Sequence, residues 1–141
     1  MPVVDASLVV ALALDDERAP AVEDLMRRWA EADAEMHAPA LLLYEVASGL
    51  TRATAAGAFP SERLSAAWSM ARTLPLRYHH LEDGQAVVEI ALHLERRSAY
   101  DAAYLALARQ LGSEVWTLDA SLVRNAGPLG YPVQMVEQGR S

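Results

Sequence analysis

Two acidic residues, Asp5 and Asp119, each follow a short apolar segment and each begin the tripeptide Asp-Ala-Ser. The segments before them, 3–4 and 115–118, are rich in β-branched and aromatic residues, which favours strands. Aspartate between a strand and a helix is a preferred N-cap, so capping alone explains either residue. If the two strands are parallel neighbours, both carboxylates also lie at the carboxyl edge of the sheet, where ligands of α/β proteins bind. Like charges facing each other there repel unless a cation lies between them.

Two further acids, Asp101 and Glu45, are expected in helices with apolar surroundings. Asp101 falls in the first turn of an apolar helix, where Ser-Ala-Tyr-Asp at 98–101 matches a capping box. Glu45 follows the apolar run 41–44 and precedes Val-Ala. A glutamate bordering an apolar face is half-exposed, paired to an arginine such as Arg52, or a ligand. The residues themselves leave these alternatives open.

Taken together, the four acids place carboxylates at strand ends and early helical turns of one predicted domain. Carboxylate oxygens are hard ligands that suit Mg²⁺ or Mn²⁺. One such ion, or a pair, can activate a water and stabilise the leaving oxygen in phosphodiester cleavage. The four histidines do not show zinc-ligand spacing with the acids, and no histidine stands in a readable relation to a nucleophilic serine.

The elements that must position these acids alternate between short apolar segments and longer helical stretches, which predicts an α/β fold with a mostly parallel sheet. Strands are expected at 3–4, 36–38, 76–79, 115–118 and 133–136, the last of them at an edge of the sheet. Helices are expected at 7–14, 20–32, 40–56, 61–74, 84–96 and 99–111, with a short one ending near 126. Ser61 is the expected N-cap of its helix, and Gly112 is expected to end the helix before it.

Composition limits the class of protein. A chain of 141 residues suits one domain, 1–141, and 52% hydrophobic residues favour globular folding. With no cysteine there is no disulfide scaffold or thiolate zinc site, and we expect a cytoplasmic protein. No signal peptide or apolar run of membrane-spanning length is present, so no membrane association is expected. A net charge of -7 argues against broad binding to polyanions, although a metal would reverse the sign locally.

The chain resembles PIN-domain nucleases, and in particular VapC-type toxins of toxin–antitoxin pairs. The resemblance covers nearly the whole chain and rests on short motifs whose order and spacing make the set specific. These motifs are Val-Val-Asp-Ala-Ser at 3–7, Tyr-Glu-Val at 44–46, the segment 98–108, and Thr-Leu-Asp at 117–119.

The resemblance implies a small, mostly parallel sheet with helices on both faces. It implies that the catalytic, metal-binding residues are Asp5, Glu45, Asp101 and Asp119. Ser7 would support Asp5 by hydrogen bonding, and Thr117 would orient the last acid. The implied activity is Mg²⁺- or Mn²⁺-dependent endoribonuclease cleavage of RNA, inhibited by a cognate antitoxin, in a protein that forms a homodimer.

The expected reaction is hydrolytic, without a covalent intermediate. The chain has no lysine, so contacts to RNA fall to its 12 arginines. Arg96, Arg97 and Arg124 are candidates because they are near the acids in sequence.

Three other classes of protein share part of this pattern of acids. A phosphoacceptor receiver domain requires a lysine, which this chain lacks. A haloacid-dehalogenase-like phosphatase requires a second aspartate two residues after its nucleophile, where Ser7 stands. The remaining alternative is a catalytically inert PIN-like module that binds RNA or protein.

Overall fold

The computed structural model describes residues 1–96 and 99–138. Their centre is a five-stranded sheet with the order β3-β2-β1-β4-β5, in which each neighbouring pair is parallel. The strands are β1 (Val3–Val4), β2 (Met36–Pro39), β3 (Leu76–His79), β4 (Val115–Thr117) and β5 (Val133–Met135). The predicted α/β class is confirmed, and the last strand lies at an edge as expected.

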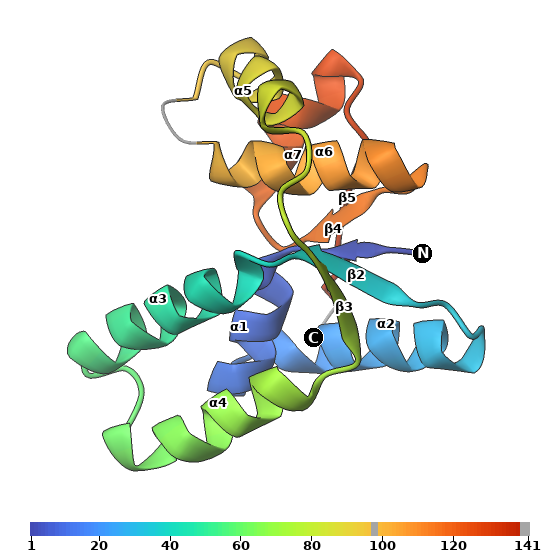
Figure 1. The fold of residues 1–141 in the computed structure, drawn as a ribbon. Helices are drawn as coiled ribbons and strands as arrows, with labels where there is room; N and C mark the ends of the chain where they lie inside the picture. Colours follow the sequence, from blue (N-terminus) through green and yellow to red (C-terminus); the bar gives the residue numbers. More distant parts are fainter. Residues whose placement is uncertain (97–98, 139–141) are drawn as a thin grey trace.

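Helices cover both faces of this sheet. They are α1 (Ala6–Leu14), α2 (Ala19–Glu31), α3 (Leu42–Ala55), α4 (Leu64–Thr73), α5 (Gly84–His93), α6 (Tyr100–Leu111) and α7 (Ala120–Ala126), with 3₁₀ turns at Ser61–Arg63 and Gly127–Leu129. Helices α1 to α4 lie on one side of the sheet and α5 to α7 on the other (Figure 1). Among the described residues, no helix has both the length and the apolar character needed to cross a membrane.

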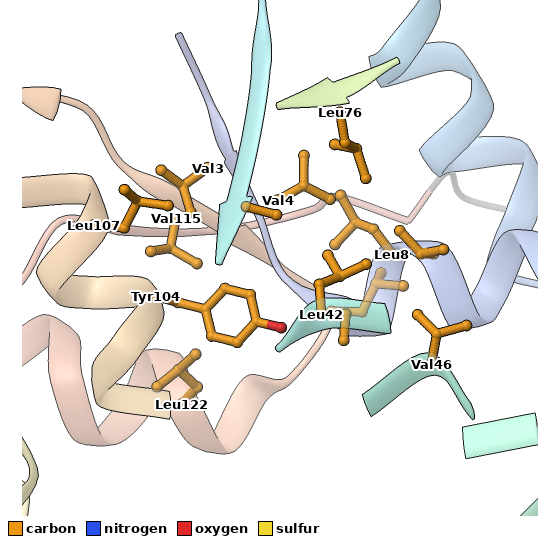
Figure 2. Close-up of a cluster of buried hydrophobic side chains, with 14 of the residues drawn as sticks. Val3, Val4, Leu8, Leu42, Val46, Leu76, Tyr104, Leu107, Val115 and Leu122 are labelled. Atoms are coloured by element: carbon orange, nitrogen blue, oxygen red, sulfur yellow. The ribbon is translucent and has the colours of Figure 1, made fainter. Parts of the chain in front are cut away.

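The hydrophobic core fills the space on both sides of the central strands. Val3, Val4 and Val115 are completely buried, as expected for parallel strands covered on both faces. In Figure 2, Tyr104 of α6 approaches these strands from one side, while Leu8 of α1 packs on the other. The two short central strands are therefore fixed from both faces, and so are the residues that follow them.

Two predicted helix ends were wrong. Ser61 is not an N-cap: Pro60 is the residue before a 3₁₀ turn there, and the α-helix begins only at Leu64. The helix predicted over 84–96 ends at His93, because Glu95 adopts a left-handed conformation with φ 57°. No glycine marks the C-terminal end at His93, so the local sequence gives little sign that the helix stops there.

Helices α1 and α3 approach closely at Gly49. A Cβ atom added there would lie 2.9 Å from Cγ2 of Val10, closer than such atoms normally come. The absent side chain lets α3 lie against α1. This contact sets the position of the first turn of α3, which carries Glu45, relative to the start of α1.

Candidate active site

All four acids predicted from the sequence line one pocket of about 540 Å³. Asp5 follows β1, Asp119 follows β4, and Glu45 and Asp101 lie in the first turns of α3 and α6. Ser7 lines the same pocket. The fold thus brings together side chains from four segments of the chain.

Asp5 and Asp119 lie at the carboxyl ends of neighbouring parallel strands. Val3 and Val4 of β1 pair with Val115 and Trp116 of β4. Each aspartate also caps the helix that follows: Asp5 accepts a hydrogen bond from the backbone N–H of Ser7, and Asp119 accepts one from Ser121 at 2.9 Å. Capping and a position at the edge of the sheet are therefore compatible for both residues.

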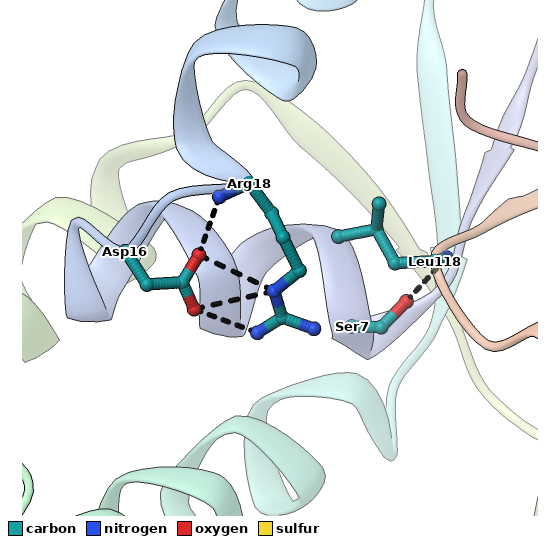
Figure 3. Close-up of polar contacts among 4 residues, drawn as sticks. All are labelled: Ser7, Asp16, Arg18 and Leu118. Atoms are coloured by element: carbon teal, nitrogen blue, oxygen red, sulfur yellow. Dashed lines mark hydrogen bonds and ion pairs between the residues drawn. The ribbon is translucent and has the colours of Figure 1, made fainter. Parts of the chain in front are cut away.

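Two hydroxyl groups hold one oxygen of Asp5. Oδ2 accepts hydrogen bonds from Ser7 Oγ at 2.7 Å and from Thr117 Oγ1 at 2.8 Å. Each hydroxyl in turn accepts a backbone N–H from the segment after β4, of Leu118 for Ser7 (Figure 3) and of Asp119 for Thr117, both at 2.9 Å. Because each hydroxyl donates its one proton to Asp5, the orientation of this carboxylate is fixed. In the described part of the chain, Oδ1 accepts no hydrogen bond.

Glu45 is held in a similar way by Tyr104. The phenol of Tyr104, completely buried in α6, donates to Glu45 Oε1 at 2.6 Å. Tyr104 was not among the residues predicted for the site. A signal was available, since Tyr104 follows Asp101 by three residues and so shares its side of the helix.

Asp101 lies in the first turn of α6 without a capping bond. The N-cap position is Ala99, whose side chain cannot cap the helix. Ser98, the predicted capping residue, lies outside the described residues. With the described residues, the Asp101 side chain makes no hydrogen bond or ion pair.

Three of the four carboxyl groups have raised pKa values. Burial raises the pKa of Asp5, of Glu45 and of Asp101. The charge of Asp119 further raises the pKa of Asp5, and the charge of Asp5 does the same for Glu45 and Asp101. Asp5, Glu45 and Asp101 are thus harder to ionise because they are buried and because other carboxylates are near, and a cation in the pocket would relieve the repulsion.

The donor chemistry fits a hard divalent cation, but the side-chain arrangement is incomplete. The pocket offers carboxylate and hydroxyl oxygens, which Mg²⁺ and Mn²⁺ prefer. Across residues 1–96 and 99–138, however, no three histidine, aspartate or glutamate side chains are so placed that they could hold a metal ion as they stand. Ligation by the four acids therefore stays a prediction.

Two arginines line the pocket, and neither is among the three that sequence proximity suggested. They are Arg18, at the start of α2, and Arg52, in the last turn of α3. Arg96 is close enough to Asp101 to oppose the rise in its pKa, but it does not line the pocket. Arg124 belongs to α7 and does not line it either, and Arg97 lies outside the described residues.

Comparison with known proteins gives a consistent result. Residues 3–128 match the model of the PIN domain. Ribonuclease VapC3 of Pyrobaculum aerophilum is 32% identical over 137 residues, covering 92% of this chain and 98% of that protein. Ribonuclease VapC9 of Mycobacterium tuberculosis is 34% identical over 139 residues, covering 96% of this chain and 98% of that one.

Solved structures share the fold at lower identity. The crystal structure of PAE2754 from Pyrobaculum aerophilum has a TM-score of 0.66 at 20% identity, covering 88% of this chain and 78% of that one. The structure of Mycobacterium tuberculosis VapC20, described as a sarcin-ricin loop cleaving toxin, has a TM-score of 0.66 at 22% identity and covers both chains completely.

Proposed function

The chain belongs to the PIN-domain family, and from this membership we propose that it is a metal-dependent endoribonuclease, the toxin of a toxin–antitoxin pair. The observation that carries the proposal is the convergence of Asp5, Glu45, Asp101 and Asp119 on one pocket. Relatives of nearly the same length bear the name ribonuclease, which supports RNA as the substrate class. We propose a cognate antitoxin as the partner, in keeping with the VapC names of the relatives, and we propose a homodimer as the assembly and the cytoplasm as the location.

The four acids would hold Mg²⁺ or Mn²⁺. A bound divalent ion supplies Lewis-acid activation of water and stabilises the leaving oxygen of a phosphodiester. The protein's own contribution is to fix the carboxylates before any ion binds. Ser7 and Thr117 occupy Asp5 Oδ2, and Tyr104 occupies Glu45 Oε1, so the second oxygen of each carboxylate is left for a ligand.

An inert PIN-like binding module is the alternative. One observation favours it: no three acids of the described chain form a complete metal site as they stand. Titration of the folded protein with Mn²⁺ separates the two functions. Saturable binding that Asp5→Asn weakens supports the nuclease, and binding unaffected by that change supports the inert module.

Cleavage of a mixed RNA pool by the purified, antitoxin-free protein tests the proposal directly. Asp5→Asn is a suitable inactive variant, because asparagine also caps helices and the fold should be retained. Asp33→Asn is the matched control, since Asp33 is exposed and its left-handed conformation, φ 55°, is one that asparagine adopts readily.

We expect cleavage by the wild-type chain and by Asp33→Asn in Mg²⁺ or Mn²⁺, and none with a chelator or with Asp5→Asn. Cleavage that persists in Asp5→Asn would show that the acid pocket is not the active site. No cleavage in either metal, from folded protein that also fails to bind Mn²⁺, would favour the inert module.

A further inference from the structure

Arg18 is a cation that the fold holds in place beside the acid pocket. Asp16 accepts hydrogen bonds from the backbone N–H of Arg18 at 2.9 Å and from Nη2 at 2.7 Å, with Nε at 3.2 Å (Figure 3). Asp16 is itself tied to α1, because its N–H donates to Ala11 O. The other terminal nitrogen, Nη1, makes no recorded contact in the described chain, and the side chain remains 37% exposed. The ion pair with Asp16 holds the Arg18 side chain in place but leaves the N–H groups of Nη1 available to a ligand.

Within the part of the chain that the structure describes, Arg52 is a cation without an anionic partner. It is exposed on α3, seven residues after Glu45, so the two residues lie two turns apart on the same side of the helix. Its charge opposes the rise in the pKa of Glu45, which places it within electrostatic reach of the acid. No ion pair or hydrogen bond of its guanidinium is recorded among residues 1–96 and 99–138.

A polyanion cannot approach four carboxylates without local positive charge. The chain carries a net charge of -7, so its overall field repels RNA. Arginine suits the task because its planar fork binds a phosphate through paired N–H groups. Glu45 and Arg52 are separated by about 10 Å along the helix axis. At that distance Arg52 is placed for a phosphate next to the scissile bond rather than for the scissile phosphate itself.

We propose that Arg18 and Arg52 bind phosphates of the RNA strand that flank the bond to be cleaved, and so position the strand over the acid pocket. This inference rests on the proposed function, because it takes RNA as the substrate. Neither arginine is assigned a part in the chemical step. Both act through backbone phosphates, so their contribution is independent of RNA sequence.

Salt-dependent binding provides a readout that a merely structural role would not change. A labelled, mixed-sequence single-stranded RNA of twelve nucleotides is titrated in Mg²⁺ with the Asp5→Asn protein, which prevents cleavage. Arg18→Gln and Arg52→Gln are compared with Arg72→Gln, an exposed arginine of α4 that lines no pocket with the acids. Each lost phosphate contact should reduce the slope of log K against log salt by about 0.7.

We expect a slope reduced by about 0.7 in each test variant, by about 1.4 in the double variant, and unchanged in Arg72→Gln. In the cleavage-competent protein, Arg52→Gln should lower kcat/KM about tenfold, mainly through KM. Arg18→Lys separates charge from folding: it keeps the positive charge and should keep the slope even if the contact with Asp16 weakens.

Equal slopes in Arg52→Gln and Arg72→Gln would overturn the proposal, and so would RNA binding by the Asp5→Asn protein that does not depend on salt. The two proposals fail separately. Cleavage that neither arginine variant affects would refute only the proposed phosphate contacts. RNA binding that depends on the arginines, without cleavage, would refute only the nuclease function and would indicate an RNA-binding module.

Discussion

Replacing Thr117 by valine tests whether the hydroxyl network beneath the pocket holds the site together. Valine keeps the β-branched shape of a completely buried residue in β4 and removes only the hydroxyl. The change deletes the bond from Oγ1 to Asp5 Oδ2 and leaves the backbone N–H of Asp119 without its acceptor. Removing this one oxygen atom therefore deprives both the Asp5 carboxylate and the Asp119 N–H of a hydrogen-bond partner.

The expected loss follows from these two contacts. A hydrogen bond to a charged acceptor contributes about 1.5–3 kcal/mol, and the N–H of the exposed Asp119, whose bond to Thr117 is only partly buried, costs about 1 kcal/mol when it is left without that acceptor. Ser7 still donates to Asp5, and the added methyl group recovers about 1 kcal/mol by burial. We therefore expect the free energy of unfolding to fall by about 2 kcal/mol, which is a shift of roughly 1 M in the urea midpoint.

Urea unfolding of the metal-free protein at pH 8 measures this loss. Thr51→Val is the matched control, because the hydroxyl of Thr51 bonds to Ala47 O on an exposed face of α3, and its loss should change stability by less than about 0.5 kcal/mol. A Thr117→Val protein as stable as the Thr51→Val protein would refute the reasoning. Combined with Ser7→Ala, the effect should be non-additive, because both hydroxyls share one carboxylate oxygen.

Three further changes have defined outcomes in the same unfolding assay. Asp101→Asn should leave the metal-free protein as stable or a few tenths of a kcal/mol more stable, because burial and the neighbouring carboxylates raise the pKa of Asp101; a loss above about 1 kcal/mol would contradict this and indicate a capping role. Tyr104→Phe should cost about 1.5 kcal/mol by removing the donor to the half-exposed Glu45, and an unchanged midpoint would mean that the bond does not form in solution. Gly49→Ala should destabilise the protein by about 1 kcal/mol through overlap with Val10, despite alanine's better helix propensity. In a Val10→Ala background the same change should become stabilising, and a loss of equal size in both backgrounds would rule out the overlap.

The strand ends before the two aspartates were predictable because local chemistry determines them. An aspartate after an apolar segment ends the strand and caps the next helix, as Asp5 and Asp119 both do. Which strands are neighbours was left open by the sequence. The adjacency of β1 and β4 joins segments over a hundred residues apart, and packing of the whole domain decides it.

The supporting side chains were harder to predict than the acids. Arg18 has no local signal for the site, because it reaches the pocket only through the packing of its helix. Spacing along a helix relates Tyr104 to Asp101 and Arg52 to Glu45, but it does not show that these side chains meet the other acids. His37 is another case: it is buried in β2, and its Nδ1 lies 2.8 Å from Nε2 of His79 in β3, a contact between residues 42 positions apart. Contacts of this kind follow from strand register, which the sequence does not specify.

The hydroxyl network has a consequence for when the protein can become active. Asp5 is made early in synthesis, whereas Thr117 lies 112 residues later and belongs to the strand that completes the centre of the sheet. Closing a loop of that length comes late, because its entropy must be lost before the contacts form. A nascent chain that has not yet produced β4 therefore lacks the strand that pairs with β1, and its Asp5 carboxylate has Ser7 but not Thr117 as a hydrogen-bond donor. The acid pocket can therefore be complete only after the ribosome has synthesised β4.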